Sequence, residues 1–242
     1  MTIYSPPQNY IVFNGKNLTD FDVYVSGEGT FLSPEREFES VTVPGKNGDL
    51  LYDSGRYKNV TVTYPAFILE NLKNNMIGLR EWLLSSPGYS KLEDTYHPEE
   101  YRLAAFVGPI TMGDVYYLDA GTFELSFNCK PQRYLKTGDV ATTIVGQETL
   151  HNRTLFASKP KIRVYGTGIV NIGDYSFEVL AHQNEYVDVD CELQDCYYGT
   201  ENCNNYVLLT NSIFPTLKPG TNLISLGEGI TKIDIYPRWW ML

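Results

Sequence analysis

Residues 122–129 have the sequence TFELSFNC, in which polar and apolar side chains alternate at every position. Successive side chains of a β-strand point to opposite faces, so this period of two predicts a half-buried strand with one wet face. The apolar face would carry Phe123, Leu125, Phe127 and Cys129. The middle of the chain therefore favours a sheet over a helix.

Similar strand-like runs lie on both sides of this segment. They cover residues 10–13, 38–43, 60–68, 102–107, 161–165, 186–193, 206–210, 222–225 and 231–236. Pro-Gly and Asn-Gly dipeptides separate several of them, which is typical of short strands joined by turns. We therefore expect a mainly β protein.

A single stretch, residues 70–85, predicts a helix. Its apolar residues recur every three or four positions, at Leu72, Met76, Leu79 and Leu83. The dipeptide Pro87-Gly88 follows one residue later, and this pair cannot continue a helix.

The strongest break in the pattern follows the central strand. The chain runs into Pro131 and then into a polar stretch, residues 137–149, that has no periodicity. We therefore predict an N-terminal domain over residues 1–133 and a C-terminal domain over residues 134–242. Strands around one helix favour a barrel-like β-rich fold for the first domain, and short strands at regular spacing favour a β-sandwich for the second.

The composition excludes some classes of function. The 242 residues carry a formal net charge of -10 without a cluster of Lys and Arg, which argues against specific nucleic-acid binding. Every apolar run is shorter than the roughly 20 residues that a membrane helix needs. The first ten residues have no basic segment followed by an apolar one, so we expect no signal peptide and synthesis in the cytoplasm.

Three cysteines follow His182 and suggest a zinc site as one interpretation. They are Cys191, Cys196 and Cys203. Their spacing differs from the closely spaced pairs that present two thiolates to a tetrahedral metal. We therefore favour free structural thiols and expect no metal and no cofactor.

Residues 186–193 repeat the strand alternation, with Cys191 and Leu193 expected on the inward face. The outward face would carry Asp188, Asp190 and Glu192. A calcium site or a pair of catalytic carboxylates is one interpretation, but a solvated strand face is the simpler one. The chain has no Gly-x-Ser-x-Gly motif, and its histidines lack partners at useful spacing, so we predict that it is not an enzyme.

Two further segments invite alternatives. Residues 45–49 (GKNGD) superficially resemble a phosphate-binding loop. A phosphate-binding loop leads into a helix, but strand-like sequence follows here, so a turn is favoured. Trp239 and Trp240 stand beside Arg238 and suit either a sugar-stacking site or internal packing. Packing is favoured, because neighbours in a strand face opposite sides.

The order of the motifs resembles that of the distal tail protein (Dit) family of siphophages, the bacteriophages with long, flexible tails. The motifs are VPGKNGDL at 43–50, LREWL at 79–83, FNCKPQRY at 127–134, NRTLFASKP at 152–160, YGTG at 165–168, FPTLKPG at 214–220 and PRWW at 237–240. The resemblance spans nearly the whole chain.

This resemblance implies a β-rich N-terminal domain that forms a hexameric ring and a C-terminal galectin-like β-sandwich. It also implies a structural hub of the tail tip in the virion, at the distal end of the tail. Its partners would be the tail-tube protein on one side and a tail-associated lysin or tail-fibre protein on the other, with DNA passing through the ring. The family offers no catalytic residues to carry over.

A closed ring needs heterologous contacts, and tyrosine suits them because its ring is apolar and its tip is polar. We expect the loop at residues 45–57 to contribute to subunit contact or to the channel. The candidates are Gly45, Lys46, Asn47, Gly48, Asp49, Tyr52, Arg56 and Tyr57. The alternative is a lectin-like tail protein in which Trp239 or Trp240 stacks on a sugar.

Overall fold

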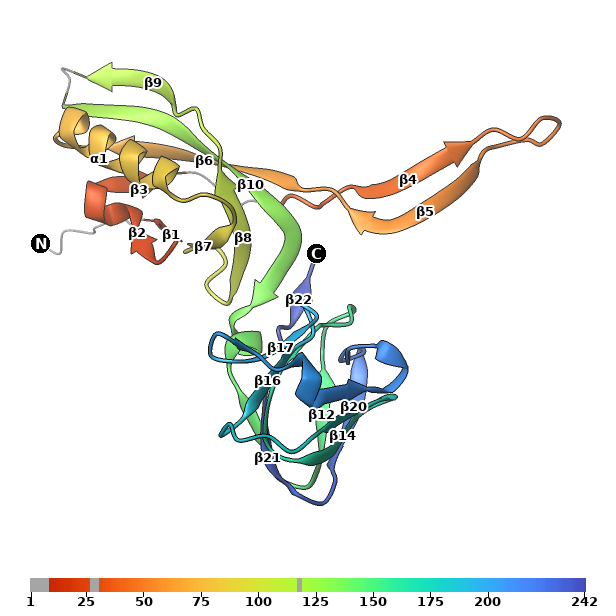
Figure 1. Cartoon of the computed structure of the whole chain (residues 1–242). Helices are drawn as coiled ribbons and strands as arrows, with labels where there is room; N and C mark the ends of the chain where they lie inside the picture. Colours follow the sequence, from red (N-terminus) through yellow and green to blue (C-terminus); the bar gives the residue numbers. More distant parts are fainter. Residues whose placement is uncertain (1–8, 27–30, 117–118) are drawn as a thin grey trace, which may run out of the picture. The chain divides into compact units, whose positions relative to one another are not determined.

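A computed structural model describes residues 9–26, 31–116 and 119–242 (Figure 1). The chain divides into two compact units, one ending at Arg133 and one covering Tyr134–Met241. Each unit has its own hydrophobic core. We describe the units separately.

The first unit is built on a curled sheet with the strand order β2-β1-β7-β8-β10-β6-β3, and β9 pairs with β10. Its strands are β1 (Ile11–Phe13), β2 (Lys16–Asn17), β3 (Val23–Val25), β6 (Val60–Ile68), β7 (Ser90–Asp94), β8 (Glu100–Phe106), β9 (Thr111–Tyr116) and β10 (Ala120–Leu135). The long strand β10 contains the segment TFELSFNC and runs antiparallel to β6. The four predicted apolar residues of this segment are buried, which confirms the alternation.

The predicted helix is α1 (Leu72–Ser85), and it is the one α-helix among the described residues. Its buried residues are Leu72, Leu79 and Leu83. The Leu72 amide donates to the Asp119 carbonyl at 3.0 Å, and the Asn71 amide donates to the Asp119 carboxylate at 3.1 Å. Asp119 thus supplies the acceptors at the start of the helix, which begins two residues later than predicted.

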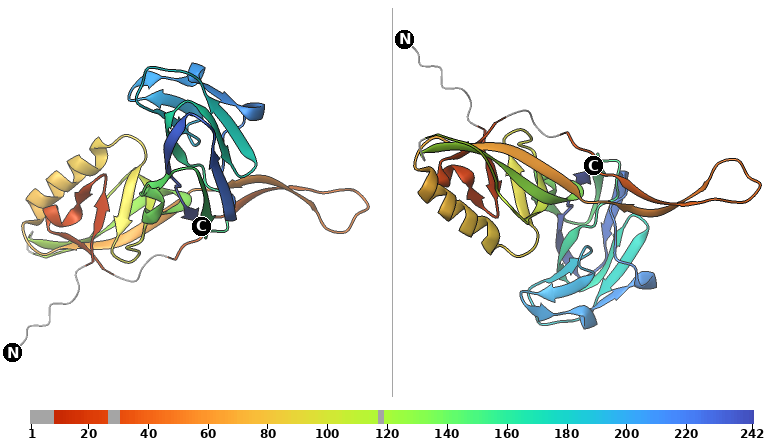
Figure 2. Two further views of the ribbon diagram at one scale, coloured as in Figure 1. Left: turned by 90° about the horizontal axis from the view of Figure 1, so that it is seen from below. Right: turned by 90° about the horizontal axis from the view of Figure 1, so that it is seen from above.

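The helix lies over the curled sheet, next to the 3₁₀ helix η1 (Leu18–Phe21), as Figure 2 shows. Trp82 of α1 packs between Phe13, at 5.8 Å, and Phe21, at 5.6 Å between ring centroids. These aromatic contacts fix the helix on the sheet.

Strands β4 (Arg36–Val41) and β5 (Leu50–Tyr57) form a separate two-stranded sheet within the first unit. We call residues 36–57 the hairpin arm. Residues 50–57, predicted as part of a loop, therefore form a strand. The arm pairs with no other described strand of this unit (Figure 1).

The second unit contains two antiparallel sheets. The first has the order β11-β21-β13-β16-β17-β18 and the second has the order β12-β20-β14-β15-β19. Their strands are β11 (Thr142–Ile144), β12 (Gln147–Asn152), β13 (Lys161–Gly166), β14 (Gly168–Ile172), β15 (Tyr175–Val179), β16 (Val187–Asp190), β17 (Asp195–Tyr198), β18 (Glu201–Asn202), β19 (Val207–Leu209), β20 (Gly220–Leu226) and β21 (Ile230–Tyr236). The remaining elements are η2 (Lys136–Asp139), η3 (Asn204–Tyr206), η4 (Thr210–Ser212) and β22 (Trp240–Met241).

Both sheets of the second unit contribute to one core. Ile162, Val189 and Ile233 come from the first sheet, and Val170 and Phe177 come from the second. This arrangement is a β-sandwich. The described chain is therefore mainly β with one helix, as predicted. No described helix has both the length and the apolar character needed to cross a bilayer.

The expectation for residues 186–193 is wrong in part. Asp188 and Asp190 were expected in water, yet each is only 2% exposed. Leu193 was expected inside, yet it is 67% exposed, because the strand ends at Asp190 and the chain turns away. Alternation does place Val187 and Val189 in the core, but Arg163 and Arg238 cover the opposite face of the strand.

Candidate functional site

The structure brings all eight predicted interface residues onto the hairpin arm. Gly45, Lys46, Asn47, Gly48 and Asp49 lie at its tip, and Tyr52, Arg56 and Tyr57 lie on β5. Seven of the eight are exposed, and Tyr57 is half-buried. The arm is thus the candidate interaction site of the first unit.

The tip has a specific local conformation. Gly45 and Gly48 have φ values of 79° and 78°, in the left-handed region that favours glycine. The Asp49 carboxylate accepts hydrogen bonds from the Ser40 hydroxyl at 2.7 Å and from the Thr42 hydroxyl at 3.0 Å. These two bonds lower the pKa of Asp49, so the tip keeps its negative charge.

Ion pairs join the strands near the base of the arm. Arg36 pairs with Asp53, Arg56 pairs with Glu37 at 3.0 Å and Lys58 pairs with Glu35 at 3.1 Å. Water and salt screen exposed pairs of this kind, so they fix the register more than they stabilise the arm.

The register gives the arm two different faces. Glu39 lies opposite Tyr52 and Val41 lies opposite Leu50, so these four residues share the Tyr52 face. The other face, the Leu51 face, carries Phe38, Ser40, Leu51 and Asp53. The Tyr52 face is therefore mostly apolar with one carboxylate, and the Leu51 face is more polar.

The apolar residues of the arm lack a cover within the described chain. Leu50 is 53% exposed, Leu51 62% and Tyr52 65%. A two-stranded hairpin is marginally stable by itself in water, and contiguous exposed apolar residues mark interaction surfaces. The arm therefore has the character of a segment that is buried in an assembly.

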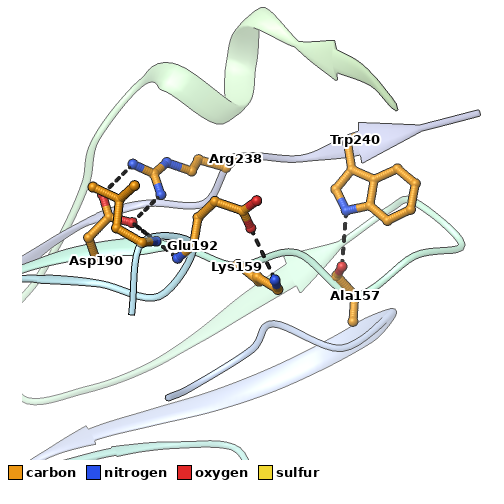
Figure 3. Close-up of polar contacts among 7 residues, drawn as sticks. Ala157, Lys159, Asp190, Glu192, Arg238 and Trp240 are labelled. Carbon is orange, nitrogen blue, oxygen red and sulfur yellow. Dashed lines mark hydrogen bonds and ion pairs between the residues drawn. The ribbon is translucent and has the colours of Figure 1, made fainter. Parts of the chain in front are cut away.

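A second cluster lies near the end of the second unit. The Arg238 guanidinium donates two hydrogen bonds to the Asp190 carboxylate, each of 2.6 Å (Figure 3). The Asp190 carboxylate also accepts from the amides of Glu192 and Leu193, at 3.0 and 3.1 Å. Burial raises the pKa of Asp190, but the hydrogen bonds from Arg238 and these amides outweigh it and hold the pKa below its usual value.

A neighbouring pair has the same form. Arg163 donates to Asp188 at 2.7 and 2.8 Å, and its guanidinium lies 3.8 Å from the centroid of the Tyr186 ring. The hydrogen bond to Asp188 raises the pKa of Arg163. Sequence reasoning missed both pairs, because their members are 48 and 25 residues apart and no local pattern connects them.

The two tryptophans have different surroundings. Trp239 packs against the core of the second unit. Trp240 stacks on Phe156 at 4.4 Å between ring centroids, and its indole nitrogen donates to the Ala157 carbonyl at 3.0 Å (Figure 3). Packing thus occupies part of each ring, and the arrangement favours the packing interpretation over sugar stacking.

All four cysteines are free and buried. Burial raises the pKa values of the Cys129 and Cys196 thiols to about 12. Among the described residues, no group of three or more His, Cys, Asp or Glu side chains is arranged to hold a metal. The histidines are also dispersed, with His97 in the first unit and His151 and His182 in the second.

A curled sheet with one helix, followed by a β-sandwich, is a fold known from hub proteins of phage tails. The solved structure of SPP1 Dit (gp 19.1), described as a paradigm of the hub adsorption apparatus in phages that infect Gram-positive bacteria, matches with a TM-score of 0.74. The match covers 98% of this chain and 100% of that chain at 15% sequence identity. The match supports a Dit-like tail hub fold and confirms the predicted mainly β architecture.

Two structures of the phage P2 baseplate in its activated conformation match as well. The structure with Ca has a TM-score of 0.54 at 11% identity, covering 95% of this chain and 98% of that chain. The structure with Sr has a TM-score of 0.53 at 12% identity, covering 94% and 97%. No protein-family model and no curated protein sequence matches the chain.

Proposed function

We propose that this protein is a structural hub of a siphophage tail tip, located in the virion at the distal end of the tail. It would form a homohexameric ring between the tail tube and a tail-associated lysin or tail-fibre protein of the receptor-binding apparatus. The observation that carries the proposal is the likeness to SPP1 Dit, which extends over 98% of this chain and all of that one.

The exposed surface of the hairpin arm is an argument for the proposed ring. Its exposed apolar residues need a partner, and every residue of the predicted interface lies on it. A ring is built from head-to-tail contacts, in which one surface of each subunit meets a different surface of the next. An arm that pairs with no other described strand of its own unit is suited to such a contact.

The charge of the chain suits a channel for DNA. A formal net charge of -10 per chain becomes -60 in a hexamer (six times -10). Negative potential around a channel repels phosphates, so DNA would pass without adhering. The proposed role is structural and non-enzymatic, with no cofactor and no specific binding of nucleic acid.

The proposed C-terminal domain is a galectin-like sandwich that serves as a scaffold and not as a lectin. Function depends on the site and not on the fold, and both tryptophans are partly used in packing, Trp239 against the core and Trp240 on Phe156. Binding of the intact chain to a glycan array, lost on Trp240→Ala, would contradict this part of the proposal.

Mass photometry and negative-stain electron microscopy of the full chain test the ring, both alone and mixed with the tail-tube protein of the same phage. We expect sixfold rings of about 165 kDa for the chain itself (six times 27.5 kDa). A chain that stays monomeric under both conditions would refute the proposal.

Deletion of the arm is a matched control for this experiment. The Lys58 amide donates to the Glu35 carbonyl at 2.9 Å, so a short Gly-Ser turn can join the two residues once residues 36–57 are removed. We expect the shortened chain to fold and to remain monomeric. Rings formed by the shortened chain would remove the arm from the contact.

A further inference from the structure

Helix α1 has an outward face that the core of the first unit does not use. Together with β9 it borders a groove of about 370 Å³. The groove is lined by Leu72, Lys73, Met76, Ile77, Arg80, Met112 and Val115. We call it the α1–β9 groove.

The chemistry of the α1–β9 groove is apolar with a positive rim. Ile77, Met112 and Val115 are each 40–44% exposed, although they are apolar. Both charged lining residues, Lys73 and Arg80, are cations, and neither side chain has an ion pair or hydrogen bond within the described chain. The groove therefore suits an apolar segment that carries negative charge.

The Tyr52 face of the hairpin arm has this composition. Val41, Leu50 and Tyr52 are exposed apolar side chains on one face, and Glu39 beside them has no ion pair within the described chain. The acids of the Leu51 face and the tip are engaged, since Asp53 pairs with Arg36 and Asp49 accepts from Ser40 and Thr42. Glu39 is thus the carboxylate of the arm that is available to a basic groove.

We propose that the α1–β9 groove receives the Tyr52 face of the hairpin arm from a second copy of this chain. The two surfaces differ in shape and charge, so the contact is heterologous, and each subunit offers one of each. This inference rests on the proposed ring and assigns the two surfaces that meet at each junction. Glu39 would then lie against Arg80 or Lys73 of the neighbouring subunit.

A charge exchange tests the contact. Arg80→Glu and Glu39→Arg each place like charges at the junction, and we expect each to weaken self-association at least tenfold. The double variant Arg80→Glu/Glu39→Arg restores opposite charges, and we expect an affinity within about threefold of the original. Analytical ultracentrifugation at two salt concentrations gives the association constants and their dependence on screening.

The arm supplies a matched pair of apolar substitutions. Leu50 and Leu51 are adjacent, have similar exposure and point to opposite faces. We expect Leu50→Ser to weaken self-association about tenfold and Leu51→Ser to change it less than threefold. Both substitutions replace an exposed leucine in the same strand, so a general loss of hairpin structure would affect them equally.

The results of these experiments distinguish a failure of the groove contact from a failure of the proposed ring. Rings that persist in Arg80→Glu, or a double variant that is no better than the single ones, overturn the groove contact and leave the hub standing. Equal effects of Leu50→Ser and Leu51→Ser overturn it too. If Arg80→Glu spares the ring but abolishes binding of the tail-tube protein, the groove belongs to that partner. A chain that never self-associates refutes both proposals.

Discussion

Breaking the Arg238–Asp190 pair by Arg238→Met should destabilise the second unit strongly. The substitution keeps the aliphatic part of the side chain and removes both 2.6 Å hydrogen bonds. It leaves a carboxylate that is 2% exposed without its counter-ion. Removing one partner of a buried pair costs about 3–5 kcal/mol.

The lower end of that range applies here. The Arg238 side chain is 27% exposed, so water can partly solvate the site, and two backbone amides still bind Asp190. A loss of about 3 kcal/mol corresponds to a fall in Tm of roughly 12 °C, at about 4 °C per kcal/mol for a unit of this size. Thermal unfolding of the full chain, followed by near-ultraviolet circular dichroism, measures it; Trp239 and Trp240 of the second unit contribute to this signal together with Trp82 of the first.

Two variants make this prediction specific. Asp190→Leu/Arg238→Met removes both charges, so we expect it to recover most of the lost stability. Lys159→Met removes the partner of Glu192 in a half-exposed pair at 3.3 Å, and we expect a change below about 1 kcal/mol. A Tm of Arg238→Met within about 3 °C of the original, or a double variant that is less stable than the single one, would refute the reasoning.

Three further predictions concern the same fold. The pKa of Asp190 is depressed in the native state. The ion pair therefore contributes its full stability at pH values above the unfolded pKa of about 3.9, and this contribution is lost as pH falls through the native pKa. Urea midpoints should therefore fall on acidification more in the original chain than in Asp190→Leu/Arg238→Met. With thiol pKa values of about 12, Cys129 and Cys196 should react with Ellman's reagent only after denaturation, and a native reaction would contradict their burial. Gly138→Ala would place a Cβ 2.3 Å from the Trp239 amide nitrogen, so we expect a loss above about 2 kcal/mol in thermal unfolding, and an unchanged Tm would show that the backbone yields there.

Local patterns were sufficient for the central strand and the helix of this fold. The alternation in TFELSFNC identified the core strand β10, and the spacing of leucines identified α1 to within two residues. Both signals lie within one element, where the period of the backbone directly sets which side chains are buried.

Long-range partners were beyond the reach of such patterns. The alternation gave the correct sides for Val187 and Val189 but put Asp188 and Asp190 in water, because it carries no information on the arginines that cover them from other segments. The candidate interface shows the same limit. Its residues could be assigned to one segment, but the two faces of the arm depend on the β4–β5 register, and the α1–β9 groove depends on packing between distant segments.

The contacts between η2 and the residues around Arg238 have a consequence for synthesis. The Arg238 amide donates to the Gly138 carbonyl. The first and last segments of the second unit are thus in contact, although they are 100 residues apart in the sequence (238 minus 138). Ribosomes add roughly 5–20 residues per second, so β11 waits about 5–20 s for its partner β21 and for Arg238. Throughout that interval the apolar side chain of Ile144 lacks its native cover. The fold of the second unit is therefore completed only after its last strands have been synthesised, whereas strands β1 to β10 are all synthesised before β11.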